Sequence, residues 1–328
     1  MAVLTTASLP SAGWGQAEFY RGKTISMVVG SRLTGTLGIS ALTVSHHLGK
    51  HIPGNPTVIL RQMPGGAHLN ATNYAFNVAE ADGLTILAAN PAVAIAQLFK
   101  VPAVRFDLRK FAWLGSSGAD GVLFAIRSDL PYKTFKDLQS ANPELIVGST
   151  APGSNSYDTP MLLKQFAGAK LRLISGYAAN GDIRLALERK EVDGWTALAT
   201  TVKQAAEQGL VRPMVRGRAP VPGLDDLPVD EELAQSDIGR SLMMIRGMPL
   251  AIGRPYAVRP GTPPDRVAVL QKALKELIAD PAFLAEARAS QIDMAYISAA
   301  DVSQSFETIF NQPPEALEAM HIYLKVGE

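Results

Sequence analysis

Short apolar runs typical of β-strands alternate along this chain with segments of helical periodicity. Near the start, strands are expected at residues 24–29, 57–60 and 84–87, and helices at residues 39–50 and 69–77. The pattern resumes further along, with strands expected at residues 122–126, 145–147, 171–174 and 211–215 and helices at 134–138, 156–166 and 182–188. Strands that are separated by helices form parallel sheets with helices packed on their faces. The alternation therefore predicts an α/β fold with two parallel sheets.

The length of the chain predicts that each sheet belongs to a lobe of its own. A single core rarely grows beyond about 250–300 residues, and this chain has 328. Prolines indicate that residues 216–229 and 249–264 are not helical, and amphipathic helices follow at 267–278, 282–289 and 299–310. Because such helices need a sheet to cover, we expect them to return to the first sheet. Lobe 1 would then hold residues 18–122 and 248–328, and lobe 2 residues 123–247.

Charge and composition exclude several classes of partner. The formal net charge is only +1 and both signs are interspersed, so the electrostatic footprint of a nucleic-acid-binding protein is missing. The absence of cysteine excludes disulfides, thiolate metal sites and cysteine nucleophiles. No run approaches the ~20 apolar residues that span a bilayer. We expect a small-molecule ligand, with no cofactor and no metal.

The first seventeen residues resemble the end of an export signal. A weakly apolar stretch from Ala2 to Ser11 leads to Gly15-Gln16-Ala17, which has the small-x-small pattern of a signal-peptidase site. No basic residue precedes Arg21, and Pro10 interrupts the apolar run, so the signal is incomplete. An ordinary disordered N-terminus is the alternative. With a genuine signal, the protein would act in the periplasm.

Two glycine-containing loops, each between a strand and a helix, are the candidate binding elements. The first glycine loop (residues 30–38) contains Ser31, Arg32, Leu33, Thr34, Gly35 and Thr36. The second glycine loop (residues 148–156) contains Ser149, Thr150, Ala151, Gly153, Ser154, Asn155 and Ser156. Unpaired N–H groups and the positive dipole end make a helix N-terminus suitable for anions, and ligands of open α/β sheets bind at the carboxyl ends of strands. Each loop could also be a simple turn, but two of them favour a ligand with two polar ends.

Nucleotide-binding and hydrolase motifs are missing. Thr36-Leu37 stands where a P-loop has lysine followed by serine or threonine, and no G-x-G-x-x-G follows a strand. No G-x-S-x-G elbow occurs either. His46, His47 and His51 form an H-H-x-x-x-H run in which His47 and His51 share a helix face, and no acidic residue lies among them, which favours a solvated helix face over a metal site.

A series of short motifs follows in a distinctive order along residues 18–328. The motifs are Phe19-Tyr20-Arg21-Gly22-Lys23-Thr24, residues 49–56, Met63-Pro64-Gly65-Gly66-Ala67, Ala81-Asp82-Gly83, Val147-Gly148-Ser149, Gly176-Tyr177, Glu191-Val192-Asp193-Gly194, residues 254–258 and Pro260-Gly261-Thr262-Pro263. Each is an ordinary turn, but their order and spacing resemble the receptor components of tripartite tricarboxylate transporters, the Bug-type periplasmic solute-binding proteins.

This resemblance implies a periplasmic binding protein-like Venus flytrap. Two α/β lobes would be joined by two crossing segments, near residues 121–125 and 245–250. A small organic carboxylate, either a di- or tricarboxylate or an aromatic acid, would be held between the lobes by the two glycine loops. A monomeric receptor without enzymatic activity would deliver it to the membrane permease subunits of an ion-driven transporter.

Further residues are assigned to the ligand site with a structural alternative for each. Arg32 stands in a loop that is glycine-rich in the family, so it could pair with a second acidic group of the ligand or be a solvated loop arginine. Tyr177 could donate to a carboxylate, Asp193 and Asn90 could line the site at strand ends, and Trp195 could stack on a flat ligand. A sensory module, or an enzyme on the same scaffold, is the alternative function.

Overall fold

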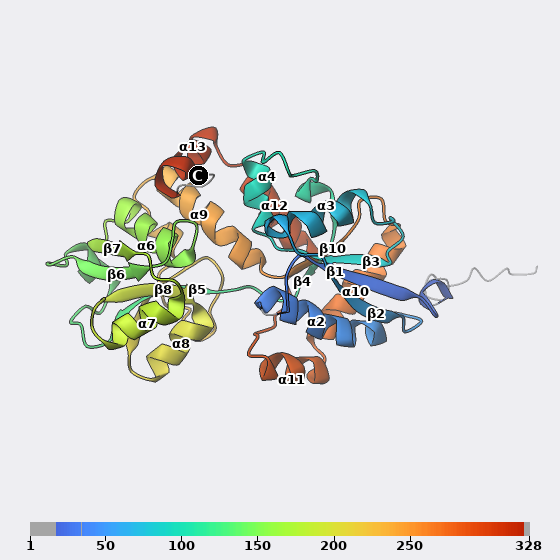
Figure 1. Ribbon diagram of the computed structural model, residues 1–328, viewed down its shortest axis with the longest axis horizontal. Helices are drawn as coiled ribbons and strands as arrows, with labels where there is room; N and C mark the ends of the chain where they lie inside the picture. The colour runs from blue at the N-terminus through green and yellow to red at the C-terminus, as the bar shows by residue number, and fades with distance from the viewer. Residues whose placement is uncertain (1–17, 34, 325–328) are drawn as a thin grey trace, which may run out of the picture. The chain divides into compact units, whose positions relative to one another are not determined.

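The computed structural model describes residues 18–33 and 35–324, which divide into two compact units (Figure 1). Unit 1 extends to Gly118 and resumes from Ile252 to Phe306, and unit 2 comprises Ala119–Ala251 and the segment from Glu307 onward. The chain therefore passes between the units three times. The sequence-based expectation had only two passages and assigned all residues beyond 247 to the first lobe.

Unit 1 is built on a five-stranded sheet in the order β2-β1-β3-β10-β4. Its strands are β1 (Thr24–Val29), β2 (Thr57–Gln62), β3 (Thr85–Ala88), β4 (Ala112–Ser116) and β10 (Pro255–Val258). The strands β1, β2 and β3 are parallel, whereas β10 runs antiparallel to both β3 and β4. The sheet is therefore mixed and not parallel throughout, because β10 brings the chain back from unit 2 and inserts between β3 and β4.

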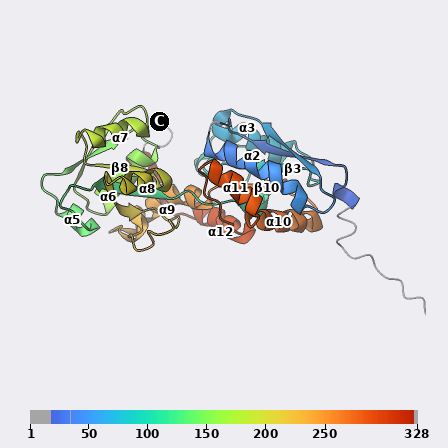
Figure 2. The same ribbon diagram turned by 90° about the horizontal axis from the view of Figure 1, so that it is seen from below.

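Helices cover both faces of this sheet. On one face, α2 (Thr36–Leu48), α10 (Pro264–Ile278) and α11 (Pro281–Ala289) lie side by side (Figure 2). The other face carries α3 (Leu69–Asn77), α4 (Val93–Leu98) and α12 (Ala299–Phe310). Phe306 of α12 stacks on Trp113 of β4, with ring centroids 4.7 Å apart. The C-terminal helices up to Phe306 thus pack on the first sheet.

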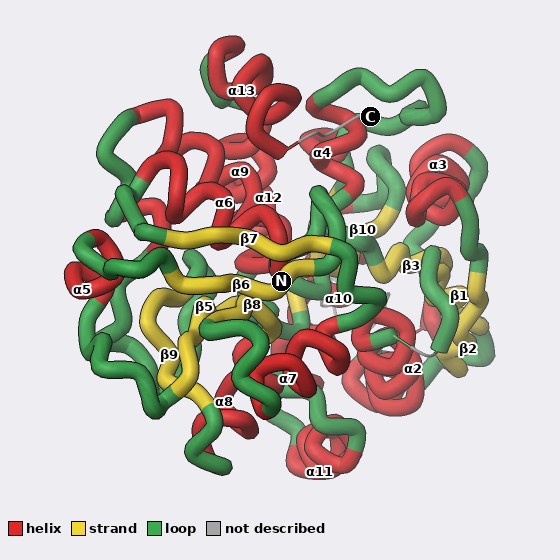
Figure 3. The backbone as a smooth tube through the Cα atoms, turned by 60° about the vertical axis from the view of Figure 1, so that its left-hand side comes forward, coloured by secondary structure: helices red, strands yellow, loops and turns green. Residues whose placement is uncertain are grey.

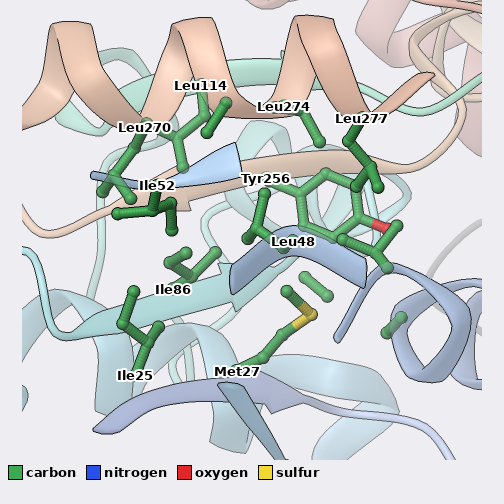
Figure 4. Close-up of a cluster of buried hydrophobic side chains, with 14 of the residues drawn as sticks. Ile25, Met27, Leu48, Ile52, Ile86, Leu114, Tyr256, Leu270, Leu274 and Leu277 are labelled. Carbon is green, nitrogen blue, oxygen red and sulfur yellow. The ribbon is translucent and has the colours of Figure 1, made fainter. Parts of the chain in front are cut away.

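The core under α2 and α10 follows from the apolar periodicity of α10. Leu270, Leu274 and Leu277 are buried against strand residues such as Ile86 and Tyr256 (Figure 4). Their spacing of three and four residues places them on one face of the helix. Burial of each such side chain stabilises the fold by about 1.5–3 kcal/mol. This packing fixes α2, and with it the first glycine loop, on the sheet.

Unit 2 has a second five-stranded sheet, in the order β7-β6-β8-β5-β9. Its strands are β5 (Val122–Arg127), β6 (Leu145–Ser149), β7 (Leu171–Ser175), β8 (Gly194–Leu198) and β9 (Val211–Arg216). The strands β6, β7 and β8 are parallel, and β5 is antiparallel to β8 and β9. This sheet is also mixed, since β5 enters the unit in the direction opposite to its neighbours.

Figure 3 shows the helical layers on the two faces of the unit 2 sheet. The helices α6 (Asn155–Phe166), α9 (Asp237–Ile252) and α13 (Pro314–Leu324) lie on one face, and α7 (Asn180–Glu188) and α8 (Ala199–Glu207) on the other. The short helix α5 (Phe135–Gln139) precedes β6. Two differences from the sequence-based expectation occur here. Residues 249–264 were expected to be non-helical, but Pro249 lies inside α9, which ends before Gly253, a residue with a positive φ of 69°. Residues beyond 247 were expected in the first lobe, but α13 packs on α6 of unit 2 through Phe166 and Tyr323.

Candidate functional site

Loops gather at one edge of the unit 1 sheet because its strands end in register. Val29, the last residue of β1, aligns with Gln62 of β2 and with Ala88 of β3. The first glycine loop, the loop from Met63 and the turn at Asn90 therefore leave the sheet side by side. The carboxyl edge of parallel strands is where open α/β sheets bind ligands.

The first glycine loop folds tightly over the start of α2. A β-carbon on Gly38 would overlap the carbonyl oxygen of Arg32, so the close approach requires glycine. The same carbonyl accepts a hydrogen bond from Ser31 Oγ at 2.9 Å. The side chains of Arg32 and Leu33 are exposed, and Arg32 forms no ion pair within the described residues. Thr34, also assigned to the site by sequence, lies outside the described residues.

The N-terminus of α2 is suited to an anion. Gly35 is the N-cap and has no side chain that could bond the first N–H groups, and the first turn contains no acidic residue. Thr36, the first residue of the helix, is half-buried. Uncapped N–H groups and the helix dipole place partial positive charge at this end. Together with Arg32, the described part of the loop is electropositive.

His68 is a residue of this edge that the sequence-based prediction missed. It ends a 3-10 turn, Gly66–His68, directly after the loop from Met63. A β-carbon on Gly30 would lie only 3.0 Å from Cα and Cβ of His68, so the two loops are in contact. The available signal was the Pro64-Gly65-Gly66 turn, which follows a strand just as the first glycine loop does.

Asn90 has a local role at the same edge. Its Oδ1 accepts a hydrogen bond from the Ala92 N–H at 2.9 Å, which closes the turn between β3 and α4. This is the structural alternative for Asn90, and it leaves the side-chain NH₂ group as the part that could face a ligand.

In unit 2, hydroxyl groups cluster around the second glycine loop. Ser156 Oγ accepts from the Thr150 N–H at 3.1 Å, and Thr150 Oγ1 lies 2.8 Å from Ser154 Oγ and 2.9 Å from Ser156 Oγ. Ser149 Oγ lies 2.9 Å from Ser175 Oγ at the end of β7. Ser149 and Ser156 are buried. The predicted hydroxyls are therefore together, but they bond mainly to one another.

The backbone N–H groups of this loop are also largely in use. The Gly153 N–H donates to Asp158 Oδ1 at 2.9 Å, and the Ser154 N–H donates to the Ala151 carbonyl at 3.2 Å. Ser154 caps α6 by accepting from the Tyr157 N–H at 3.3 Å. The second glycine loop is thus a closed, internally bonded turn, in contrast to the uncapped start of α2. Asn155, in the first turn of α6, is half-buried.

A buried ion pair holds the second glycine loop in place. Arg246 of α9 donates from Nε to Asp158 Oδ2 at 2.5 Å and from Nη2 to the Gly153 carbonyl at 3.0 Å. Only 1% of the Asp158 side chain is exposed. Burial raises the pKa of Asp158, while Arg246 and the Gly153 N–H oppose that rise. Sequence reasoning missed Arg246 because it lies in a different helix, far along the chain.

Tyr177 joins the second glycine loop through its backbone. Its N–H donates to the Ser149 carbonyl at 3.3 Å, next to the bond from Gly176 N–H to the Thr150 carbonyl. The ring packs on the unit 2 core, and a β-carbon on Gly148 would lie 3.4 Å from it. The structure therefore places Tyr177 beside the loop, with its ring partly buried.

The structure does not bring Asp193 and Trp195 to this edge. Asp193 accepts from the Ile146 N–H at 2.8 Å and lies 3.4 Å from Arg127, at the amino ends of β6 and β8. Trp195 is completely buried in the unit 2 core, and its indole nitrogen has no hydrogen-bond partner. The ring has no exposed face on which a ligand could stack. Asp193 directly precedes β8 and Trp195 is the second residue of that strand. The sequence did not show that this motif lies at the amino end of the strand and not at its carboxyl end.

The histidines near the end of α2 pair with acidic residues from a distant segment. His46 and His47 each lie 2.8 Å from an oxygen of Glu286 in α11, and His51 lies 3.0 Å from Asp280 at the start of that helix. They therefore connect α2 to α11 and are not simply a solvated face. The described residues contain no cluster of three or more histidine or acidic side chains that could hold a metal. Nor does the described part of the chain include a helix long and apolar enough to cross a membrane.

Comparison with solved structures identifies the fold. A TctC solute-binding protein from Polaromonas matches with a TM-score of 0.72 and 16% identity, over 92% of this chain and 99% of that one. MatC from Rhodopseudomonas palustris, solved with malate, has a TM-score of 0.56 and 18% identity, over 90% of this chain and 99% of its own. A second R. palustris protein, solved with adipate, has a TM-score of 0.57 and 19% identity, over 92% of this chain and 97% of its own.

These matches confirm the fold predicted from the sequence motifs. The structural neighbours are TctC- and Bug-type solute-binding proteins, and the likeness extends over most of the chain. No protein-family model and no curated protein matches the chain. The two mixed sheets with their covering helices therefore form a periplasmic binding protein fold of the TctC type.

Proposed function

We propose that this protein is the periplasmic receptor of a tripartite tricarboxylate-type transporter and that it binds a small organic carboxylate. The observation that carries the proposal is the combination of this fold with an uncapped, acid-free start of α2 and an exposed Arg32 beside it, which forms no ion pair with the residues that the structure describes. Backbone N–H groups at a helix N-terminus and a guanidinium group are both strong partners of a carboxylate.

The described chemistry favours binding over catalysis. At the strand edges, Ser149, Thr150 and Ser154 bond to other hydroxyls or to carbonyl oxygens. Ser31 likewise bonds to a carbonyl. None of these four hydroxyls donates to a histidine or a carboxylate, which is the arrangement that activates a nucleophile.

Dicarboxylates are the substrate class that the comparisons favour. MatC was solved with malate, and the second R. palustris protein with adipate. Malate and adipate each carry two carboxylates. In this chain, Arg32 and the start of α2 would take one carboxylate of such an acid. Delivery to membrane permease subunits, a monomeric state and a periplasmic location belong to the same proposal.

A thermal-shift panel tests the proposal. The panel contains malate, succinate, adipate, citrate and benzoate at millimolar concentration, with glucose as the neutral control. A ligand that binds only the folded state stabilises it by RT ln(1 + [L]/Kd), so at least one acid should raise the melting temperature while glucose does not. No shift with any acid would refute the proposal.

Arg32 provides the matched variant. Arg32→Met should reduce the shift given by the best acid, because it removes the exposed guanidinium beside the start of α2. Arg21→Met is the control, since Arg21 is an exposed arginine that precedes β1, at the opposite end of that strand. Equal losses in both variants would indicate a general charge effect and no defined carboxylate site.

A further inference from the structure

A pocket of about 480 Å³ opens on unit 2 between α5, the edge strand β9 and residues 226–233. In Figure 3, α5 and β9 lie on the same side of this unit. The lining consists mostly of apolar side chains, namely Phe135, Pro213, Met214, Leu227, Pro228 and Leu233. Sites for small molecules have volumes of about 300–1,000 Å³ and a mainly apolar lining with a few polar groups. The pocket has the size and the lining of such a site.

Prolines explain why the edge of β9 stays open here. The Arg216 N–H donates to the Pro228 carbonyl at 3.0 Å, and Arg216 and Val229 form an isolated bridge. Neither Pro213 nor Pro228 has an N–H group that could extend this pairing. Residues 226–228 therefore do not continue the sheet as a further strand, and space remains between them and α5.

The α5 wall of the pocket is fixed by hydrogen bonds. The Lys133 N–H donates to Asp137 Oδ2 at 2.7 Å. The Leu138 carbonyl accepts from the Lys170 N–H at 2.8 Å, and the Lys170 carbonyl accepts from the N–H of Leu145, the first residue of β6, at 3.0 Å. The pocket is thus preformed and lies toward the amino end of β6, whereas the second glycine loop follows the carboxyl end of that strand.

Two lysines give the rim of the pocket a positive charge. Lys133 and Lys136 are exposed, and neither forms an ion pair with a residue that the structure describes. Asp226 is the acidic residue of the lining and is also exposed. Gln139 is already in use, because its Nε2 donates to the Ala167 carbonyl at 2.9 Å. Two lysines against one aspartate leave one excess positive charge above an apolar floor.

We propose that this pocket is a second ligand site, which binds an organic anion with a single carboxylate on an apolar body, such as an arylalkanoate. The floor removes the apolar body from water, and the ammonium groups of Lys133 and Lys136 pair with the carboxylate. A second carboxylate would lie on the apolar floor or near Asp226, and both positions are unfavourable. The site is therefore separate from the carboxylate site of unit 1, and this inference does not depend on the proposed function.

NMR of the methionine methyl groups in the full chain tests the proposal at the pocket itself. Met214 lines the floor, and its methyl signal is identified as the one that Met214→Leu removes. Titration with 3-phenylpropionate should move this signal to saturation. The neutral 3-phenylpropan-1-ol should bind about ten-fold more weakly, because it lacks the carboxylate, and the cationic 3-phenylpropylamine more weakly still.

Lysine variants show whether the rim holds the carboxylate. Lys133→Met combined with Lys136→Met should weaken the binding of 3-phenylpropionate about ten-fold and leave the affinity for the alcohol unchanged. Lys164→Met is the matched control, since Lys164 is an exposed lysine of α6 outside the pocket. Asp226→Asn should tighten the binding of the acid, because it removes a repulsive charge from the rim. All four side chains are exposed, so these variants should fold like the wild type.

Several results would overturn the second site. They are a Met214 signal that the acid does not move, equal affinities for the acid and the alcohol, and a double lysine variant that binds the acid no more weakly than Lys164→Met does. Arg32→Met should leave the Met214 titration unchanged, even where 3-phenylpropionate also binds at the start of α2. A Met214 shift that Arg32→Met abolishes would assign the binding to unit 1 and also refute the proposal. The proposed function is judged by its own panel and survives each of these failures.

Discussion

Removal of the Arg246 guanidinium tests how the second glycine loop is held. In Arg246→Met, Asp158 keeps the Gly153 N–H as a donor but loses its ionic partner at 2.5 Å. Removal of one partner from a buried pair costs about 3–5 kcal/mol. Arg246 retains 23% side-chain exposure, and Asp158 can take up a proton, so we expect the low end of this range, about 3 kcal/mol at pH 7.

The pH dependence gives this prediction its specific signature. Burial raises the pKa of Asp158 above that of the unfolded chain, so the folded state binds the extra proton, and the stability that this proton contributes is lost as pH rises through the folded-state pKa. Without Arg246 the pKa rises further. The stability gap between wild type and Arg246→Met should therefore be largest at neutral pH and should narrow near pH 5.

Urea unfolding followed by circular dichroism at both pH values measures the gap. Arg240→Met is the control, because Arg240 is exposed on the same helix and its loss should change stability by less than about 0.5 kcal/mol. Asp158→Asn added to Arg246→Met should recover part of the loss, since a neutral amide replaces the buried charge. A gap of equal size at pH 7 and pH 5 would refute the ion-pair argument.

Three other changes probe the core, the first glycine loop and a buried carboxyl group. Leu274→Ala should lower the free energy of unfolding by about 2–5 kcal/mol in urea titrations, because Leu274 of α10 is buried against the unit 1 sheet; a loss below about 1 kcal/mol would contradict that packing. Gly38→Ala should displace the Arg32 carbonyl and weaken acid binding in calorimetry while the helix content stays unchanged; wild-type affinity would contradict it. Burial raises the pKa of Asp230 to about 7, so the contribution of this carboxyl group to stability should fall as the pH rises from 4 to 8. Asp230→Asn should then melt higher than wild type at pH 8 and similarly at pH 4; a lower melting temperature at pH 8 would refute this.

The alternation of strands and helices was predictable from local pattern alone. The strand at Thr24–Val29 and the helix at Leu69–Asn77 occur with the bounds that their periodicity indicates. β10 was not predictable in this way, because Pro255 opens it and its position depends on the pairing of Tyr256 with Ala88, far away in sequence. The antiparallel strand, and hence the mixed sheet, is set by that long-range pairing.

The candidate site was predictable where it depends on loops and not where it depends on distant partners. The hydroxyls of the second glycine loop lie together because they are neighbours in sequence. Arg246 reaches Asp158 from another helix, and His68 reaches Gly30 from another loop. Neither contact leaves a local signal. Asp193 shows the converse, since its motif suggested a strand end but its hydrogen bond to Ile146 places it at the amino end.

The two glycine loops look equivalent in sequence but differ in what they can offer a ligand. In the second loop, Ser154 caps α6 and Asp158 occupies the Gly153 N–H, so an anion would compete with bonds that already exist. In the first loop, Gly35 leaves the start of α2 uncapped and Arg32 is exposed. Displacement of an existing hydrogen bond offsets much of the gain from a new one. The first loop should therefore supply most of the affinity for a carboxylate, so substitutions at Arg32 should weaken binding more than the loss of a hydroxyl at Ser149.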